Sequence, residues 1–314
     1  MDLYAEIING NNNALSKGIT LVESTLEEHK IISQELVMKC SEKNYNSIRI
    51  GVTGVPGVGK STFIEKFGIR FTKNDKKVAV LAIDPSSEET KGSILGDKSR
   101  MNELSNNKNV FIRPSSNSGI LGGVSNKTRD CIILCEAAGY DVIIIETVGV
   151  GQSETVVSKL VDVMLLLALT GAGDKLQGIK RGIIELANII IITKDDGDNK
   201  NKVKTTMLDF HNTLILGMSN EISINQKILR CSAKENTGIF EVKKAVEIYI
   251  NNIKENKKFN VKRQKQKIYW INKFVKEELG NIKYNELLNK NLMKDIEHKI
   301  INHKENVYEL IKKI

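Results

Sequence analysis

The sequence predicts an α/β protein with a doubly wound, mostly parallel sheet and helical extensions at both ends. Residues 48–62 read as an apolar strand that runs into a complete G-x-x-x-x-G-K-[ST] phosphate loop. Between residues 48 and 254, short apolar runs alternate with amphipathic stretches, as in sheets covered on both faces. Outside that region only helical periodicity remains. Together these observations indicate a P-loop NTPase.

Residues 1–46 are predicted to form a helical arm. Leu15, Ile19 and Val22 recur at the spacing of one helix face, and the three asparagines at positions 11–13 offer an N-cap before them. We expect this arm to pack on the α/β domain or on a partner.

The α/β domain is expected to cover residues 47–254. Predicted strands cover residues 48–53, 77–83, 110–112, 141–146, 162–169, 188–193 and 228–231. Predicted helices cover residues 60–72, 123–138, 154–160, 177–187, 200–215 and 239–253. Ligands of such sheets bind beyond the carboxyl ends of the strands, so polar motifs at those ends are expected to form one site.

Residues 255–314 are predicted to be a helical extension, with helices over 264–281 and 283–313. Packing on the α/β domain and self-association are both open for it. The chain has a net charge of +9, and residues 251–314 hold 16 Lys and Arg against 8 Asp and Glu. The basic residues alternate with Asn and Glu without aromatic clusters, so we favour a solvated helical face over a nucleic-acid surface.

The remaining composition indicates a soluble cytoplasmic protein. The four cysteines show no C-x-x-C pair or zinc-like spacing, and they are expected to be free thiols in a reducing compartment. The four histidines are scattered along the chain. No apolar run reaches the roughly 18 residues of a membrane span, and the amino terminus resembles neither a signal peptide nor a transit peptide.

The phosphate loop carries the most specific chemistry of the sequence. Its glycines let successive N–H groups face phosphate oxygens, and the following helix points its positive end at the anion. Lys60 is expected to reach the β- and γ-phosphates, and the Ser61 hydroxyl to reach Mg²⁺. The predicted phosphate-binding residues are Gly54, Val55, Pro56, Gly57, Val58, Gly59, Lys60, Ser61 and Thr62.

Acidic residues at two further strand ends are suited to hold Mg²⁺ or its water shell. Asp84 ends the second predicted strand, and Asp97 follows in a loop. Glu146 ends the fourth strand, at the position of a Walker B carboxylate, and a glycine-rich segment follows it. Glutamate is one methylene longer than the commoner aspartate, so both direct and water-mediated contact with the metal remain open.

Two later motifs predict selectivity for guanine. Residues 193–196 have the form [NT]-K-x-D, in which the Asp196 carboxylate would accept hydrogen bonds from guanine and the Lys194 stem would lie over the base. Threonine at position 193 replaces the commoner asparagine. Ser232, Ala233 and Lys234 form an S-A-K segment whose backbone N–H is expected to contact the base oxygen.

At this point the chain resembles the MeaB/ArgK/MMAA family of G-protein chaperones for adenosylcobalamin-dependent acyl-CoA mutases. The resemblance lies in the blocks GVTGVPGVGKSTF, AIDPSS, GSILGDKSRM, FIRPSSNSGILGGVSNKTRD, DVIIIETVGVGQSE and GAGDKLQGIKRG. It implies a SIMIBI-class GTPase, usually homodimeric, that binds GTP or GDP and Mg²⁺. It assigns Ser61, Asp84, Asp97 and Glu146 to the metal or its water shell.

The resemblance also implies a function, which is to gate cofactor loading into a mutase, most simply methylmalonyl-CoA mutase, and removal of damaged cofactor. Residues 171–182 match the family's additional switch, with Asp174 and Lys180 as its charged residues; Lys175 stands where an acid is usual. Gln152, Asp97 and Lys180 are candidates to position the attacking water. The chain lacks a cobalamin-binding D-x-H-x-x-G motif, so cobalamin is expected in the partner.

Three other functions remain as alternatives. One is a P-loop kinase or ATPase linked to lysine, arginine or ornithine transport, which would need a phosphate acceptor. Another is a metal-insertion GTPase, although that class usually carries a His- or Cys-rich stretch. The third is a structural nucleotide-binding module, for which the predicted Mg²⁺ ligands would be superfluous. No nucleic-acid or membrane partner is expected.

Overall fold

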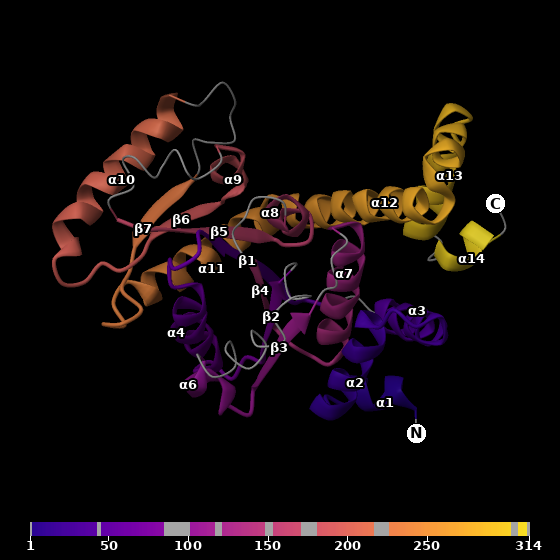
Figure 1. Ribbon diagram of the computed structural model, residues 1–314, viewed down its shortest axis with the longest axis horizontal. Coiled ribbons are helices and arrows are strands. Elements are labelled where there is room, and N and C mark those ends of the chain that lie inside the picture. Colours follow the sequence, from indigo (N-terminus) through magenta and orange to yellow (C-terminus); the bar gives the residue numbers. More distant parts are fainter. Residues whose placement is uncertain are drawn as a thin grey trace. The chain divides into compact units, whose positions relative to one another are not determined.

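The computed structural model describes residues 2–42, 45–84, 101–116, 121–147, 153–170, 181–216, 226–302 and 307–312. The chain divides into two compact units (Figure 1). The α/β unit comprises residues 46–121 and 140–253, and the helical unit comprises residues 1–45, 122–139 and 254–314. The predicted domain boundaries after residues 46 and 254 stay predictions.

The α/β unit contains one sheet of seven strands in the order β3-β2-β4-β1-β5-β6-β7, and every neighbouring pair is parallel. The strands are β1 (Ile48–Gly54), β2 (Val78–Asp84), β3 (Val110–Ser116), β4 (Val142–Thr147), β5 (Val163–Ala168), β6 (Ile189–Ile192) and β7 (Lys227–Arg230). All residues of β4, β5 and β6 are buried. This explains their unbroken apolar sequences and confirms the predicted α/β class.

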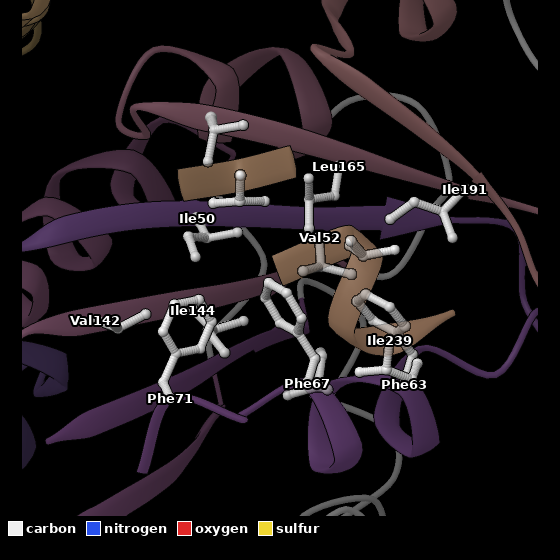
Figure 2. Packing of buried hydrophobic residues seen from close by; sticks show 14 of the residues in the cluster. Ile50, Val52, Phe63, Phe67, Phe71, Val142, Ile144, Leu165, Ile191 and Ile239 are labelled. Carbon is white, nitrogen blue, oxygen red and sulfur yellow. The ribbon is translucent and has the colours of Figure 1, made fainter. Parts of the chain in front are cut away.

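Within the described residues, six helices belong to this unit over all or most of their length. They are α4 (Lys60–Thr72), α6 (Asn102–Ser105), α8 (Ser153–Ser158), α9 (Arg181–Leu186), α10 (Asn199–Leu216) and α11 (Ile239–Glu255). On one face of the sheet, α4 and α11 pack on alternate residues of β1 and β4, such as Ile50 and Ile144 (Figure 2). Phe63 and Phe67 of α4 stack with ring centroids 5.1 Å apart, and this packing holds the start of α4 at the end of β1.

On the opposite face, apolar side chains of β5 and β6 pack against α9 and α10. The cluster includes Leu166, Ile190, Ile184 and Phe210, and Figure 1 shows α10 beside β6 and β7. Burial of both faces follows from the alternation of side chains along each strand.

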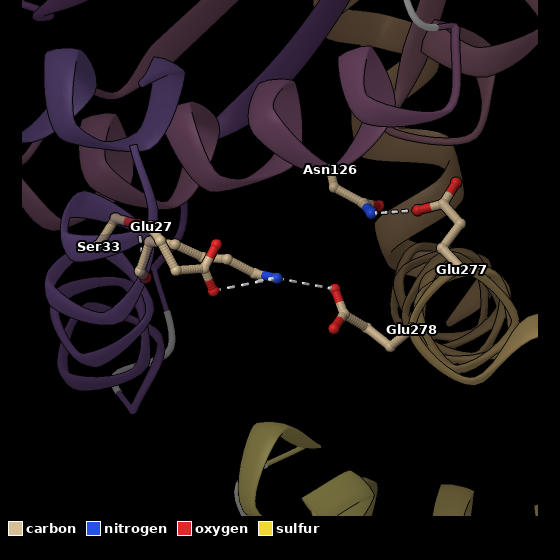
Figure 3. A network of polar contacts seen from close by, with 6 residues as sticks. Glu27, Ser33, Asn126, Glu277 and Glu278 are labelled. Atoms are coloured by element: carbon tan, nitrogen blue, oxygen red, sulfur yellow. Dashed lines mark hydrogen bonds and ion pairs between the residues drawn. The ribbon is translucent and has the colours of Figure 1, made fainter. Parts of the chain in front are cut away.

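The helical unit contains α1 (Leu3–Ile8), α2 (Asn12–Glu23), α3 (Glu27–Ser41), α7 (Leu121–Ala137), α12 (Lys258–Asn289), α13 (Leu292–Asn302) and α14 (Val307–Lys312). The Asn11 side chain caps α2 by accepting from two backbone N–H groups, as predicted. Polar contacts link α7 and α3 to α12: Asn126 donates to Glu277, and Lys30 lies 3.6 Å from Glu278 (Figure 3). Helices from both chain ends therefore share a unit with α7.

The helical unit also contains a half-buried charged pair that lies against a core residue, Trp270. The Arg129 guanidinium lies 3.5 Å from the ring centroid of Trp270 and 2.9 Å from the Asp130 carboxylate. Trp270 stacks on Phe274, which meets Tyr308 edge to face. Burial raises the pKa of Asp130 to about 6, although Arg129 acts in the opposite direction.

The predicted helix boundaries in the C-terminal segment are wrong. In place of helices over 264–281 and 283–313, α12 spans Lys258–Asn289 and is interrupted at Gly280, whose φ of 77° and ψ of 167° are not helical. The second predicted helix is divided by a break at Lys290 and Asn291, where Asn291 has a φ of 56°. The predicted gap at residue 282 lies two residues from the interruption at Gly280, whereas the apolar spacing continues past Lys290 and Asn291, so the prediction merged the helices on either side of that second break.

All four cysteines are buried free thiols, in agreement with the sequence prediction. None of the helices within the described ranges combines the length and the hydropathy that crossing a bilayer requires.

Candidate functional site

The phosphate loop connects β1 to α4 at the carboxyl edge of the sheet. Gly59 precedes α4 with a φ of 94°, a left-handed conformation that favours glycine. Gly54 faces a different restraint, because a Cβ there would lie 2.5 Å from the carbonyl oxygen of Leu167. The first N–H groups of α4 have no acceptor within their own helix, so they are suited to bind phosphate.

Lys60 and Ser61 are the first two residues of α4. The Lys60 side chain contacts the phosphate loop, and the Ser61 side chain contacts the predicted metal ligand Glu146. Lys60 Nζ donates to the carbonyl oxygens of Gly54 at 2.8 Å and Val55 at 3.4 Å. Ser61 Oγ donates to Oε1 of Glu146, at the end of β4, at 3.3 Å. The structure therefore brings together Ser61 and Glu146, two residues that the sequence predicted from separate motifs.

The oxygens of Ser61 and Glu146 fit Mg²⁺ by their chemistry. This ion prefers hard oxygen ligands, and it commonly takes only one or two from the protein because water and substrate phosphates supply the rest. Among the described residues, no cluster of three or more His, Cys, Asp and Glu side chains is arranged as a metal site. Two protein oxygens beside a phosphate loop suit a nucleotide-bound metal better than an all-protein cage.

Several predicted residues lie partly or wholly outside the described structure. The backbone of Asp84 ends β2 and pairs with Ser116, at the same edge of the sheet as Glu146, but its side chain is not among those described. Asp97, Gln152, Lys180, Asp174 and Lys175 lie outside the described residues.

The segment after β6 is bonded directly to the phosphate loop. The buried Thr193 hydroxyl donates to the carbonyl oxygens of Val58 at 2.9 Å and Ala168 at 3.3 Å. Lys194, with a φ of 58°, donates through Nζ to the carbonyl oxygen of Gly57 at 2.9 Å. The threonine that replaces the commoner asparagine thus ties the predicted base-binding segment to the loop.

The two predicted base-binding motifs also meet. The Ser232 hydroxyl donates to Oδ2 of Asp196 and accepts from the Glu235 N–H at 3.0 Å. Ser232 and Thr237 exchange two backbone hydrogen bonds of 3.0 Å, which close the turn that contains Ala233 and Lys234. Asp196 and the S-A-K turn therefore form one polar surface next to the phosphate loop.

Cys231 lies between this turn and β7 but is not suited to react. Burial raises the pKa of its thiol to about 12, and the nearby Asp195 carboxylate acts in the same direction. The protonated thiol is a poor nucleophile at neutral pH.

Sequence reasoning missed three polar residues beneath the site. Thr53 precedes Gly54, Thr147 follows Glu146, and both hydroxyls contact the buried Glu154 of α8. For Thr53 and Thr147, a position next to a predicted site residue at a strand end was the only signal that the sequence carried.

Comparisons with known proteins agree with this geometry. The family model described as "Methylmalonyl Co-A mutase-associated GTPase MeaB" matches residues 15–286. The chain is 44% identical over 272 residues to the protein named GTPase ArgK of Escherichia coli strain K12, covering 87% of this chain and 82% of that protein. It is 40% identical over 287 residues to the Mus musculus protein named "Methylmalonic aciduria type A homolog, mitochondrial", covering 88% and 69% respectively.

A solved structure extends the similarity to the fold. The protein named LAO/AO transport system kinase superimposes with a TM-score of 0.75 and 32% sequence identity. The match covers 99% of this chain and 96% of that one, so it includes both the α/β and the helical units.

Proposed function

The chain belongs to the MeaB family of methylmalonyl-CoA mutase-associated GTPases, and from this premise we propose a GTP-hydrolysing switch that serves an adenosylcobalamin-dependent acyl-CoA mutase. The observation that supports the proposal is that the predicted base-binding segment is hydrogen-bonded directly to the phosphate loop. Thr193 joins the base segment to the carbonyl oxygen of Val58, and Ser232 joins the two base motifs through Asp196.

In the proposed mechanism, the phosphates of GTP lie over residues 54–59 and the start of α4. Lys60 exchanges its contacts with loop carbonyl oxygens for contacts with phosphate oxygens, and Asp196 accepts hydrogen bonds from guanine. Ser61 and Glu146, with Asp84 and Asp97 as further proposed ligands, would hold Mg²⁺, which neutralises charge on the phosphates when bound. The remaining phosphate-binding and base-binding residues keep their predicted roles.

Hydrolysis requires an attacking water in line with the bond that breaks between the γ-phosphorus and the bridging oxygen of GDP. Asp97, Gln152 and Lys180 remain the proposed residues for orienting that water. We expect the isolated protein to hydrolyse GTP slowly, and we expect the rate to rise when the mutase binds.

The proposed client is methylmalonyl-CoA mutase or a related enzyme, and GTP hydrolysis would gate the loading and repair of its adenosylcobalamin. A homodimer, with the C-terminal helices as a candidate dimer contact, is part of this proposal. A cytoplasmic location is also part of this proposal. It agrees with the four free thiols in the described structure, because reducing compartments keep thiols free.

A transport-linked kinase is the alternative favoured by one observation, the similarity to a solved protein that is named a transport system kinase. A kinase would transfer the γ-phosphate to an acceptor and would not need to select guanine. The contact between Asp196 and Ser232 at the end of the nucleotide site favours the guanine switch.

The deciding experiment measures GTP and ATP hydrolysis by the purified protein, alone and with an adenosylcobalamin-dependent methylmalonyl-CoA mutase. GTP-selective hydrolysis that the mutase accelerates would support the proposal. ATP preference with a phosphorylated acceptor would favour the kinase. GTP hydrolysis unaffected by the mutase would refute the proposed client while retaining the GTPase.

A further inference from the structure

One buried carboxylate receives two hydrogen bonds beneath the nucleotide site. Glu154 is 0% exposed, and Thr53 and Thr147 are each 1% exposed. The Thr53 hydroxyl donates to Oε1 of Glu154 at 3.3 Å, and the Thr147 hydroxyl donates to the same oxygen at 3.5 Å. Because a buried carboxylate is costly without such donors, the three side chains form a built polar cluster.

This cluster lies where the backbone pairing between β1 and β4 ends. The last pair in their register is Val52 and Glu146. Thr53 and Thr147 are the next residue on each strand, and Glu154 bonds to both of their side chains. The carboxylate therefore continues the connection between the two strands beyond the last backbone pair.

The helix that carries Glu154 is itself fixed on β1. Gly51 of β1 leaves room for these side chains: a Cβ at this position would lie 3.3 Å from Cγ1 of Val157 and 3.2 Å from Cγ2 of Val161. Val157 lies one turn after Glu154 in α8. Val157 is 1% exposed and Val161 is fully buried. Such close packing leaves α8 little freedom to move across the strand.

Each threonine is adjacent in sequence to a group of the nucleotide site. Thr53 precedes Gly54, whose carbonyl oxygen accepts from Lys60 at 2.8 Å. Thr147 follows Glu146, whose carboxylate accepts from Ser61 at 3.3 Å. A shift between the two strand ends would alter the separation of Ser61 and Glu146, and the Glu154 cluster opposes that shift.

We propose that Glu154 is a positioning residue that holds Glu146 in register with the phosphate loop through Thr147 and Thr53. It touches neither nucleotide nor metal, and its effect is on the affinity of the site for Mg²⁺. The inference rests on the proposed metal role of Ser61 and Glu146.

The test uses the full chain and measures the Mg²⁺ concentration that gives half-maximal GTP hydrolysis, together with the Kd for Mg²⁺ of the GDP-bound protein by titration calorimetry. Thr147→Val keeps the side-chain shape and removes one donor, and Glu154→Met removes the shared acceptor. We expect the Mg²⁺ midpoint to rise about three- to tenfold in each, as for the loss of one net hydrogen bond. The double variant should show no larger shift than Glu154→Met, because both changes break one connection.

Asp162→Asn is the matched control. Asp162 is also 0% exposed and accepts from a β1 backbone N–H, that of Arg49, at 2.8 Å, but it does so at the amino end of the strand. Its substitution should lower the melting temperature and leave the Mg²⁺ midpoint within about twofold, because its bond lies far from the strand ends that hold the site.

The outcomes of this test separate the inference from the proposed function. If Thr147→Val lowers the melting temperature but leaves the Mg²⁺ midpoint at the wild-type value, Glu154 is only structural and the inference is overturned. If wild-type hydrolysis is itself independent of Mg²⁺, the proposed metal site fails first. Thr147→Val is isosteric, so the test remains decisive if Glu154→Met does not fold.

Discussion

Thr193 offers a direct test of the coupling between the phosphate loop and the base-binding segment. Thr193→Val preserves the branched shape but removes a hydroxyl that donates to Val58 at 2.9 Å and Ala168 at 3.3 Å. The Ala168 carbonyl oxygen keeps the Thr193 backbone N–H as a donor at 2.8 Å. The main loss therefore falls on the Val58 carbonyl oxygen, within the phosphate loop.

The size of the effect follows from the cost of a lost buried hydrogen bond. A net contribution of about 1 kcal/mol, plus part of the cost of leaving a carbonyl oxygen without that donor, predicts a loss of about 1.5 to 2 kcal/mol in unfolding free energy. If about 1 kcal/mol of this also appears in nucleotide binding, the Kd for GTP rises about fivefold.

Urea unfolding followed by circular dichroism would measure the first quantity, and titration calorimetry with GTP the second. Thr206→Val is the control, since Thr206 is 2% exposed and donates within α10 to the Lys202 carbonyl oxygen at 3.0 Å. It should lower stability without changing the Kd. Wild-type GTP affinity in Thr193→Val would refute the inferred coupling.

Three further predictions address charge. Asp196→Asn should weaken GTP binding about 10- to 100-fold, as for a lost charged hydrogen bond, and favour xanthosine triphosphate in competition assays; retained guanine selectivity would contradict the base assignment. Lys60→Ala should reduce GTP affinity by at least about tenfold in calorimetry while the melting temperature stays near wild type, and unchanged affinity would reject the phosphate-loop role. Burial raises the pKa of Asp130 from 3.8 to about 6, so the folded state binds this proton more tightly than the unfolded chain. The stability that this contributes is present below about pH 4 and is lost as pH rises through 6, by at most about 3 kcal/mol. Asp130→Asn should flatten this part of the curve of melting temperature against pH, and an unchanged curve would contradict the assignment.

The sheet was predictable because its strands are buried on both faces. The four isoleucines of β6, all buried, form an apolar run that has few alternatives to a central parallel strand. The helix from Lys60 to Thr72 has its predicted bounds because the phosphate-loop motif defines where it begins.

Features set by tertiary contacts were not predictable in the same way. Glu154 reads in sequence as an acid in the first turn of a helix, a position where exposed acids are common, and only the fold buries it under two threonines. The break at Lys290 and Asn291 was missed because apolar core positions such as Leu287 and Met293 continue on both sides of it. The role of Thr193 depends on a loop that is 135 residues away in sequence.

The place of β1 between β4 and β5 also means that both strands that pair with β1 are synthesised long after it. The pairing of β1 with β4 begins at Ile48 and Val142, and that with β5 extends to Gly54 and Leu167. A ribosome that adds about 5–20 residues per second needs roughly 5–20 s after completing β1 to supply its first neighbour. The phosphate loop is thus made early and acquires its supporting strands late. We therefore expect a nascent chain to bind nucleotide only after translation has passed β5, and the edges of β1 to stay unpaired until its neighbours are made.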